Sequence, residues 1–148
     1  MKKGELLSIA IKIATDAHCG AYDKGGSPYI LHPLKVMHYT KSADEEIMAI
    51  AVLHDTVEDC KEVTYFGLRA AGLTERIIEG VRCLTKVPGE TYDEYKAKVM
   101  GCPDAIIVKK ADLRHNSDIR RLKGITDKDI ARIAKYSAFY MELERGGL

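Results

Sequence analysis

The sequence contains neither a long apolar run nor an excess of charge of one sign. Its longest apolar run, 47–53, is far shorter than the roughly 20 residues that an α-helix needs to cross a bilayer. Lys and Arg together number 23 and Asp and Glu 22, so the net charge is +1 with neutral histidines. A chain with this balance has no overall electrostatic attraction for nucleic acid or anionic lipid. We therefore expect no membrane and no nucleic acid polymer among its partners.

Paired cysteines and a secretion signal are also missing. The four cysteines are widely spaced and form no Cys-x-x-Cys pair, which argues against a disulfide framework and against a zinc ribbon. Two lysines follow Met1, but Glu5 and Lys12 interrupt the apolar stretch that a signal peptide requires. We therefore expect a cytoplasmic protein whose thiols are free.

No stretch alternates apolar and polar residues over the length of a strand, so we predict no sheet. Apolar residues instead recur at helical intervals, beginning with a first helix over 6–17 that ends near Gly20. A loop over 21–29 follows, and Pro33 then fits the first turn of a second helix. The pattern predicts an all-α fold of seven or eight helices that forms one compact domain over residues 1–148.

Helix boundaries are marked by polar residues and glycines. Ser42-x-x-Glu45 has the form of a capping box and precedes the apolar run, which predicts a third helix there. Two further helices are expected to start after Thr91 and Thr126. Glycines stand where helices are expected to stop, at Gly72, Gly101 and Gly124.

The segment after the apolar run carries the strongest chemical signal. On one helix, His54 and Glu58 are four residues apart, as are Asp55 and Asp59, so their side chains project from adjoining strips of one surface. That surface continues the apolar stripe of 47–53, which lies against the core. Neighbouring carboxylates in such a place repel one another unless a cation compensates them. The sequence therefore predicts a bound metal ion.

A divalent hydrolytic metal prefers imidazole nitrogen and carboxylate oxygen, and takes ligands from several segments. Asp112 is one candidate, because it stands where the helical spacing from Ala105 and Val108 predicts an apolar residue. A histidine is another, and spacing alone does not choose between His18 and His32 or between manganese and zinc.

Three motifs occur in order along the chain: Pro-Tyr-Ile-Leu-His-Pro-Leu at 28–34, His-Asp-x-Val-Glu-Asp at 54–59 and Lys-x-Ala-Asp-x-x-His-Asn at 109–116. Together they resemble the HD-domain superfamily, and more narrowly the hydrolase domain of the RelA/SpoT type and its small stand-alone relatives. The resemblance implies an all-α fold with a divalent metal ion, usually manganese, held by four side chains: His32, His54, Asp55 and Asp112.

The resemblance also implies the reaction. Glu58 and Asp59 would place a water molecule for in-line attack on phosphorus and handle its proton, and Asn116 would contact the nucleotide. The implied substrate is (p)ppGpp, guanosine tetraphosphate or its pentaphosphate relative, cleaved to release the 3′-pyrophosphate. Lys24 and Lys109 are candidate phosphate ligands, and Lys109 lies one turn before the predicted metal ligand of the third motif.

Two acidic residues depart from the family pattern. The alarmone hydrolases commonly carry basic residues at the positions of Asp23 and Asp118, in regions expected near the nucleotide. A less charged substrate therefore stays open, either a nucleoside monophosphate or the 2′-phosphate of NADPH. A metal-bound nucleotide sensor with little turnover is a further alternative, although a pure binding module does not need both Glu58 and Asp59.

The remaining histidines and several tyrosines are expected to have structural roles. We expect His18 to pack or to support the metal ligands, and His38 and His115 to lie at the surface or the edge of the core. Four tyrosines at helical spacing are predicted to pack, with base stacking as the alternative: Tyr92, Tyr95, Tyr136 and Tyr140. The sequence predicts no particular oligomeric state.

Overall fold

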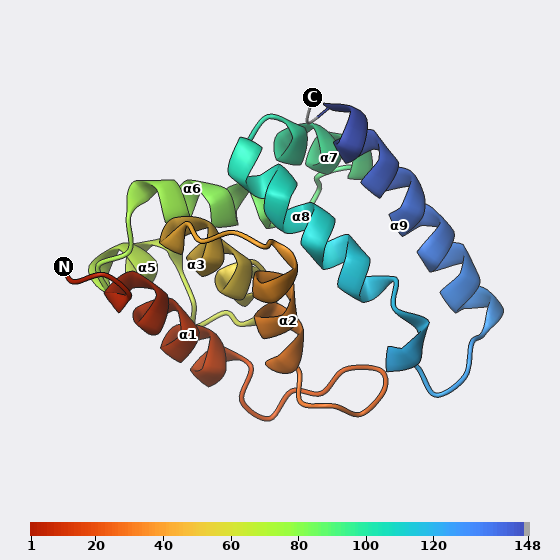
Figure 1. Cartoon of the computed structure of the whole chain (residues 1–148), viewed down its shortest axis with the longest axis horizontal. Helices are drawn as coiled ribbons and strands as arrows, with labels where there is room; N and C mark the ends of the chain where they lie inside the picture. The colour runs from red at the N-terminus through yellow and green to blue at the C-terminus, as the bar shows by residue number, and fades with distance from the viewer. Residues whose placement is uncertain (147–148) are drawn as a thin grey trace.

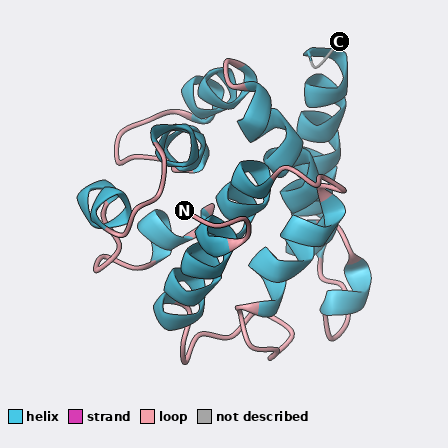
Figure 2. Cartoon of the chain, turned by 60° about the vertical axis from the view of Figure 1, so that its left-hand side comes forward, coloured by secondary structure: helices cyan, strands magenta, loops and turns pink. Residues whose placement is uncertain are grey.

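Nine α-helical segments and one 3-10 helix form the regular secondary structure of residues 1–146, which the computed structural model describes (Figures 1 and 2). In chain order they are α1 (Glu5–Ala17), α2 (Leu31–Tyr39), α3 (Glu45–Leu53), α4 (Thr56–Asp59), α5 (Tyr65–Ala70), α6 (Glu75–Leu84), α7 (Tyr92–Met100), α8 (Pro103–Asn116), η1 (Ile119–Arg121) and α9 (Asp127–Gly146). These residues form no β structure beyond one bridge between Tyr22 and Pro28. None of these helices has both the length and the apolar character of a membrane span. The all-α prediction is confirmed.

Side-chain caps at predicted positions begin two of the helices. The Thr91 hydroxyl accepts a hydrogen bond from the N–H of Glu94 at 3.1 Å, and the Glu94 carboxylate accepts one from the N–H of Thr91 at 3.4 Å. Thr126 and Asp129 form the same reciprocal pair at the start of α9, at 3.3 and 2.9 Å. Each pair satisfies backbone donors that a helix N-terminus otherwise leaves unbonded.

α3 begins where the sequence predicts, but its cap is Asp44. The carboxylate of Asp44 accepts a hydrogen bond from the N–H of Glu46 at 2.9 Å. Glu45, the expected partner of Ser42, instead accepts a hydrogen bond from the N–H of Gly4 at 2.8 Å, at the start of α1. The predicted Ser42–Glu45 capping box is therefore wrong, because a distant segment occupies the carboxylate that the box requires.

α3 is the central helix. It packs against α1, α2, α6 and α8, and every residue of 47–53 except Met48 is buried (Figure 1). A helix covered on all sides is apolar all round, which explains the uninterrupted apolar run. α6 approaches closely because Gly80 has no side chain; a Cβ there would overlap the side chain of Ile50.

The chain turns between α3 and α4, in the middle of the second motif. The hydroxyl of Thr56 donates to the carbonyl of Leu53 at 2.8 Å, and the His54 ring bonds the carbonyl of Ala51 at 2.6 Å. These side chains satisfy carbonyls that a continuing helix would have bonded. The expectation that one helix carries the whole motif is wrong: His54 and Asp55 lie at the turn, and Glu58 and Asp59 lie on the separate turn α4.

Candidate metal centre

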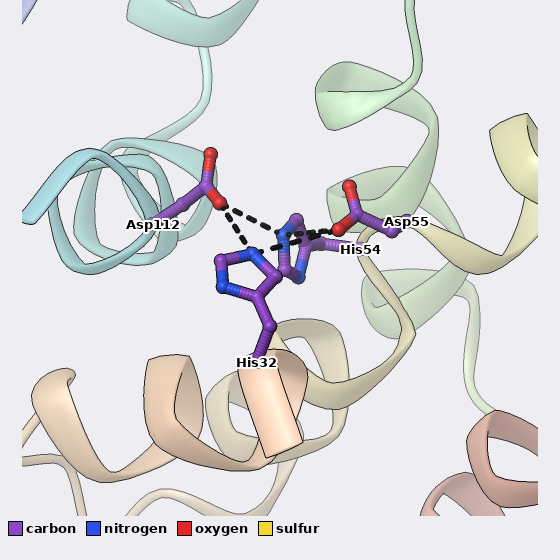
Figure 3. Close-up of side chains that lie close together, drawn as sticks. All are labelled: His32, His54, Asp55 and Asp112. Atoms are coloured by element: carbon purple, nitrogen blue, oxygen red, sulfur yellow. Dashed lines mark hydrogen bonds and ion pairs between the residues drawn. The ribbon is translucent and has the colours of Figure 1, made fainter. Parts of the chain in front are cut away.

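Side chains from three separate segments converge at the turn after α3, where they point toward one another (Figure 3). His32 comes from the first turn of α2, His54 and Asp55 from the turn, and Asp112 from the middle of α8. Each offers a nitrogen or oxygen atom, and these four atoms lie within 4.8 Å of one another. The structure therefore brings together all four side chains that the sequence proposes as ligands.

The closest approaches join nitrogen to oxygen. Nε2 of His32 lies 2.9 Å from Oδ1 of Asp112 and 3.6 Å from Oδ2 of Asp55. Nε2 of His54 lies 3.2 Å from each of the same two oxygens. Both imidazole rings and Asp112 are buried, whereas Asp55 is partly exposed. Four donors with this chemistry, brought from several segments, fit a divalent cation such as manganese or zinc.

The hydrogen bonding of His54 shows why a cation suits the site. Its Nδ1 faces the carbonyl of Ala51, which can only accept, so Nδ1 carries the proton of the neutral ring. The lone pair on Nε2 then points at the oxygens of Asp55 and Asp112. Acceptors that face acceptors require a proton or a metal ion between them.

Electrostatics reinforce this conclusion. Burial disfavours a charged His54, but the carboxylates of Asp55 and Asp112 outweigh burial and raise its pKa well above the usual value. Burial likewise opposes the charge of Asp55, yet His54 lowers the pKa of that carboxyl to about 2. Lys109 and His54 together hold the pKa of buried Asp112 well below its usual range. Both carboxylates therefore stay ionised, as metal binding requires.

Neighbouring side chains hold the two carboxylates in place. The hydroxyl of Tyr29 donates to Oδ2 of Asp55 at 2.6 Å. The ammonium group of Lys109 lies 2.9 Å from Oδ2 of Asp112, and the amide of Asn116 donates to Oδ1 of the same residue at 3.0 Å. Lys109 and Asn116, both predicted to contact substrate, thus each bond Asp112.

The predicted acid pair, Glu58 and Asp59, lies on α4, next in sequence to the converging His54 and Asp55. The carboxylate of Glu58 accepts a hydrogen bond from the N–H of Lys86 at 2.8 Å, which ties α4 to the loop after α6. Partial burial and the negative charges of Asp55 and Glu58 raise the pKa of Asp59 to about 6. A carboxylate with this pKa can take up a proton near neutral pH.

The sequence profile of the HD domain family matches residues 10–123, a span that contains all four converging side chains and the acid pair. The chain belongs to the HD domain family. Its match extends from within α1 to just past η1.

Several relatives of this HD domain are much longer proteins. A protein named guanosine-3′,5′-bis(diphosphate) 3′-pyrophosphohydrolase from Haemophilus influenzae is 30% identical over 138 residues, 83% of this chain and 20% of that protein. One of the same name from Aquifex aeolicus is 30% identical over 144 residues, 88% of this chain and 20% of that protein. A chloroplastic protein of Oryza sativa subsp. japonica, whose name places it among GTP diphosphokinases, is 33% identical over 126 residues, 72% of this chain and 14% of that protein. The chain thus spans a fifth or less of the length of these three relatives.

A pocket of about 250 Å³ adjoins the four candidate metal ligands. Tyr29 and Asn116, which bond Asp55 and Asp112, form part of its lining. Lys24, a predicted phosphate ligand, also lines the pocket, whereas Lys109 does not.

Aromatic residues divide between this pocket and the core. Tyr136 lines the pocket, in keeping with the base-stacking alternative. Tyr92 and Tyr95 pack edge-on against Phe139, as predicted for core residues. Lys110 lies over the ring of Tyr140.

Both acidic departures from the family pattern line the pocket as well. Asp23 accepts hydrogen bonds from the N–H groups of Gly25 and Ser27, at 3.0 and 2.9 Å, and lies 3.4 Å from the guanidinium of Arg121. Asp118 pairs with Arg120 at 2.9 Å. The acids therefore face the pocket while each is partnered by an arginine.

Three residues near the site had no predicted functional role: Tyr29, His115 and Arg121. Tyr29 belongs to the first motif, and its place three residues before His32 is the one signal that could have singled it out. The His115 ring is buried and stacks on His32, with 5.0 Å between centroids. It therefore lies at the edge of the core and not at the surface. Arg121 pairs with Asp23, 98 residues away, and no spacing rule reveals such a partner.

The remaining two histidines lie as expected. His38 is exposed on α2. His18 is buried, and its ring packs against Tyr29 at 4.9 Å, consistent with a packing role.

Proposed function

We propose that this HD domain is a metal-dependent phosphohydrolase that removes the 3′-pyrophosphate of (p)ppGpp. The observation that carries the proposal is the convergence of two imidazoles and two carboxylates from three segments. In the proposal these residues are the resident ligands of one divalent ion, with manganese as the expected metal: His32, His54, Asp55 and Asp112. The hydrolase names of two bacterial relatives support the substrate.

When bound, a divalent ion supplies a Lewis acid for a phosphoryl oxygen and an acidified water. Asp59 accepts the proton of the attacking water, because its pKa of about 6 leaves it ionised yet basic at neutral pH. Glu58, fixed by the N–H of Lys86, lies beside it as the second member of the acid pair.

Three further residues handle the substrate. Lys24 and Asn116 line the pocket, where they contact the nucleotide. Lys109 lies outside the pocket lining and bonds Asp112 at 2.9 Å. An ammonium group has three donors, and in the proposal a remaining donor of Lys109 binds a phosphoryl oxygen beside the metal ligands. The ligand is a small nucleotide, and we propose that the chain acts on it as a single cytoplasmic domain over residues 1–148.

A less charged nucleotide is the second candidate substrate, and one observation favours it. Asp23 and Asp118 both line the pocket, and like charges oppose a highly charged ligand. A nucleoside monophosphate or NADPH carries fewer negative charges and meets less of this opposition.

The test is turnover of a nucleotide panel by the wild-type protein with added Mn²⁺: ppGpp, GMP and NADPH, with pyrophosphate and orthophosphate measured separately. We expect pyrophosphate from ppGpp at the highest kcat/KM. His54→Ala should abolish this activity, whereas His38→Ala, which changes an exposed histidine on α2, should not. Faster phosphate release from GMP or NADPH would favour the second candidate, and binding without turnover would make the chain a nucleotide sensor.

A further inference from the structure

A pair of stacked histidines lies behind the candidate metal ligands. Nδ1 of His32 and Nδ1 of His115 are 2.7 Å apart, and the two rings are nearly parallel, with 13° between their planes. The pair joins the first turn of α2 to the last turn of α8, across 83 residues of sequence. Both rings are buried, at 2% and 9% exposure, so solvent does not replace this contact.

One proton lies between the two nitrogens, because a hydrogen bond of this length joins one donor to one acceptor. If His32 Nδ1 donates, its Nε2 keeps a lone pair directed at the space between Asp55 and Asp112. If His115 donates instead, His32 carries its proton on Nε2, which then points into the same space and blocks a cation. The direction of this one hydrogen bond decides whether His32 can be a ligand.

We propose that His115 is a positioning residue whose Nδ1 accepts a hydrogen bond from the Nδ1–H of His32, so that the Nε2 lone pair of His32 stays directed at the site where a metal ion would bind. The inference rests on the metal site of the proposed function but not on its substrate. A partner on the remote nitrogen of a ligating histidine fixes both its tautomer and the orientation of the ring.

The two ligand histidines are held by different kinds of acceptor. His54 bonds the backbone carbonyl of Ala51 at 2.6 Å, and a carbonyl can only accept. His32 instead faces a side chain that can accept or donate. Its tautomer therefore depends on residue 115, and substitution there can change it without touching the backbone.

Neighbouring side chains hold the ring of His115 in place. The edge of the Tyr39 ring packs against it at 5.9 Å. The guanidinium of Arg121 donates to the carbonyl of His115 at 3.2 Å. These contacts hold the ring where its Nδ1 lies 2.7 Å from Nδ1 of His32.

Two substitutions at residue 115 separate hydrogen bonding from packing. His115→Phe keeps a flat ring against His32 but has no acceptor, whereas His115→Asn can place an amide oxygen near the former Nδ1 position. We expect Phe to weaken Mn²⁺ binding by about tenfold to a hundredfold. Asn should stay within a few-fold of wild type, and His38→Phe, on the exposed side of α2, should have no effect.

Binding is measured by titration of the metal-free proteins with Mn²⁺, with thermal unfolding of each variant as a check on folding. Wild-type affinity in a folded Phe variant, or equal losses in Phe and Asn, would overturn the proposal. Failure to hydrolyse any nucleotide would refute the proposed function. The expected difference in Mn²⁺ affinity between the Phe and Asn variants would be unaffected by that result.

A second measurement needs no variant. The ¹⁵N shifts of ring nitrogens report histidine tautomers, and Zn²⁺ serves as a diamagnetic metal for this purpose. In the Zn²⁺-loaded wild-type protein we expect His115 to carry its proton on Nε2 alone. A proton on Nδ1 of His115 would show that it donates, and the proposal would be wrong.

Discussion

The guanidinium of Arg121 lies 3.4 Å from Oδ2 of Asp23, so an ion pair connects the loop before α2 to the 3-10 helix after α8. The loop approaches so closely that a Cβ on Gly25 would overlap the carbonyl of Arg121. Figure 1 shows these two segments side by side, although they lie far apart in the sequence. Both residues of the ion pair line the pocket, so the carboxylate of Asp23 offsets the positive charge that Arg121 brings to it.

Asp23→Asn should raise kcat/KM for a highly charged substrate. The amide oxygen can still accept from the N–H groups of Gly25 and Ser27, but Arg121 loses its anionic partner. Removal of one repulsion at a partly screened site is worth on the order of 1 kcal/mol, or about fivefold in kcat/KM. We expect this gain for ppGpp and a smaller one for GMP, measured in parallel with Mn²⁺.

Asp16→Asn on the exposed surface of α1 is the matched control, since it removes the same charge away from the pocket. Equal changes with both substrates, or no change, would show that Asp23 does not act on the bound nucleotide.

Asp59→Asn should separate catalysis from metal binding. Asp59 is not one of the four converging residues, so Mn²⁺ affinity and thermal stability should stay near the wild-type values. Loss of a general base lowers kcat by roughly 10²- to 10⁴-fold. Asp112→Asn should instead lose both metal and activity, and metal content after gel filtration distinguishes the two variants. An Asp59→Asn protein without metal would contradict the assigned roles.

Lys109→Met tests the support of Asp112. The change leaves a buried carboxylate without the ammonium group 2.9 Å away, and breaking such a pair costs roughly 3 kcal/mol. We expect a lower free energy of unfolding in the metal-free protein, measured by urea denaturation, and a partial recovery when Mn²⁺ is added.

Lys110→Met is the control for that experiment. Lys110 pairs with Glu144 at 2.8 Å, but this pair is more exposed to solvent. An exposed pair contributes about 1 kcal/mol or less, so the control should change stability little. Equal destabilisation by both substitutions would mean that the buried Lys109–Asp112 pair stabilises the fold no more than the exposed Lys110–Glu144 pair.

Local features were predictable from the sequence because their causes are local. Thr91 and Thr126 start helices through bonds to residues three positions ahead. Asp112 was recognisable as an acid on a buried helix face, where it is indeed buried. The choice of His32 over His18 came from the family resemblance, since neither spacing nor composition distinguishes two histidines that each lie near a helix end.

Features that depend on tertiary contacts were not predictable. The turn at His54 follows from side chains bonding the carbonyls at the end of α3, where helical spacing suggested continuity. The bond between His32 and His115 and the pair of Asp23 with Arg121 span 83 and 98 residues. Periodicity identifies the buried face of each helix, but it does not show which residues meet across helices.

The cap of α9 gives a test of stability against pH. Asp129 accepts hydrogen bonds from the N–H of Thr126 at 2.9 Å and from Arg132 at 2.5 Å, and these bonds lower its pKa to about 2. The unfolded chain has a value of about 3.9, so this carboxylate stabilises the fold above about pH 4 and loses its effect as the pH falls toward 2. We therefore expect the difference in unfolding free energy between wild type and Asp129→Ala, measured with urea, to shrink over that interval. A difference that is constant down to the folded-state pKa would show that the charge of Asp129 does not hold the cap.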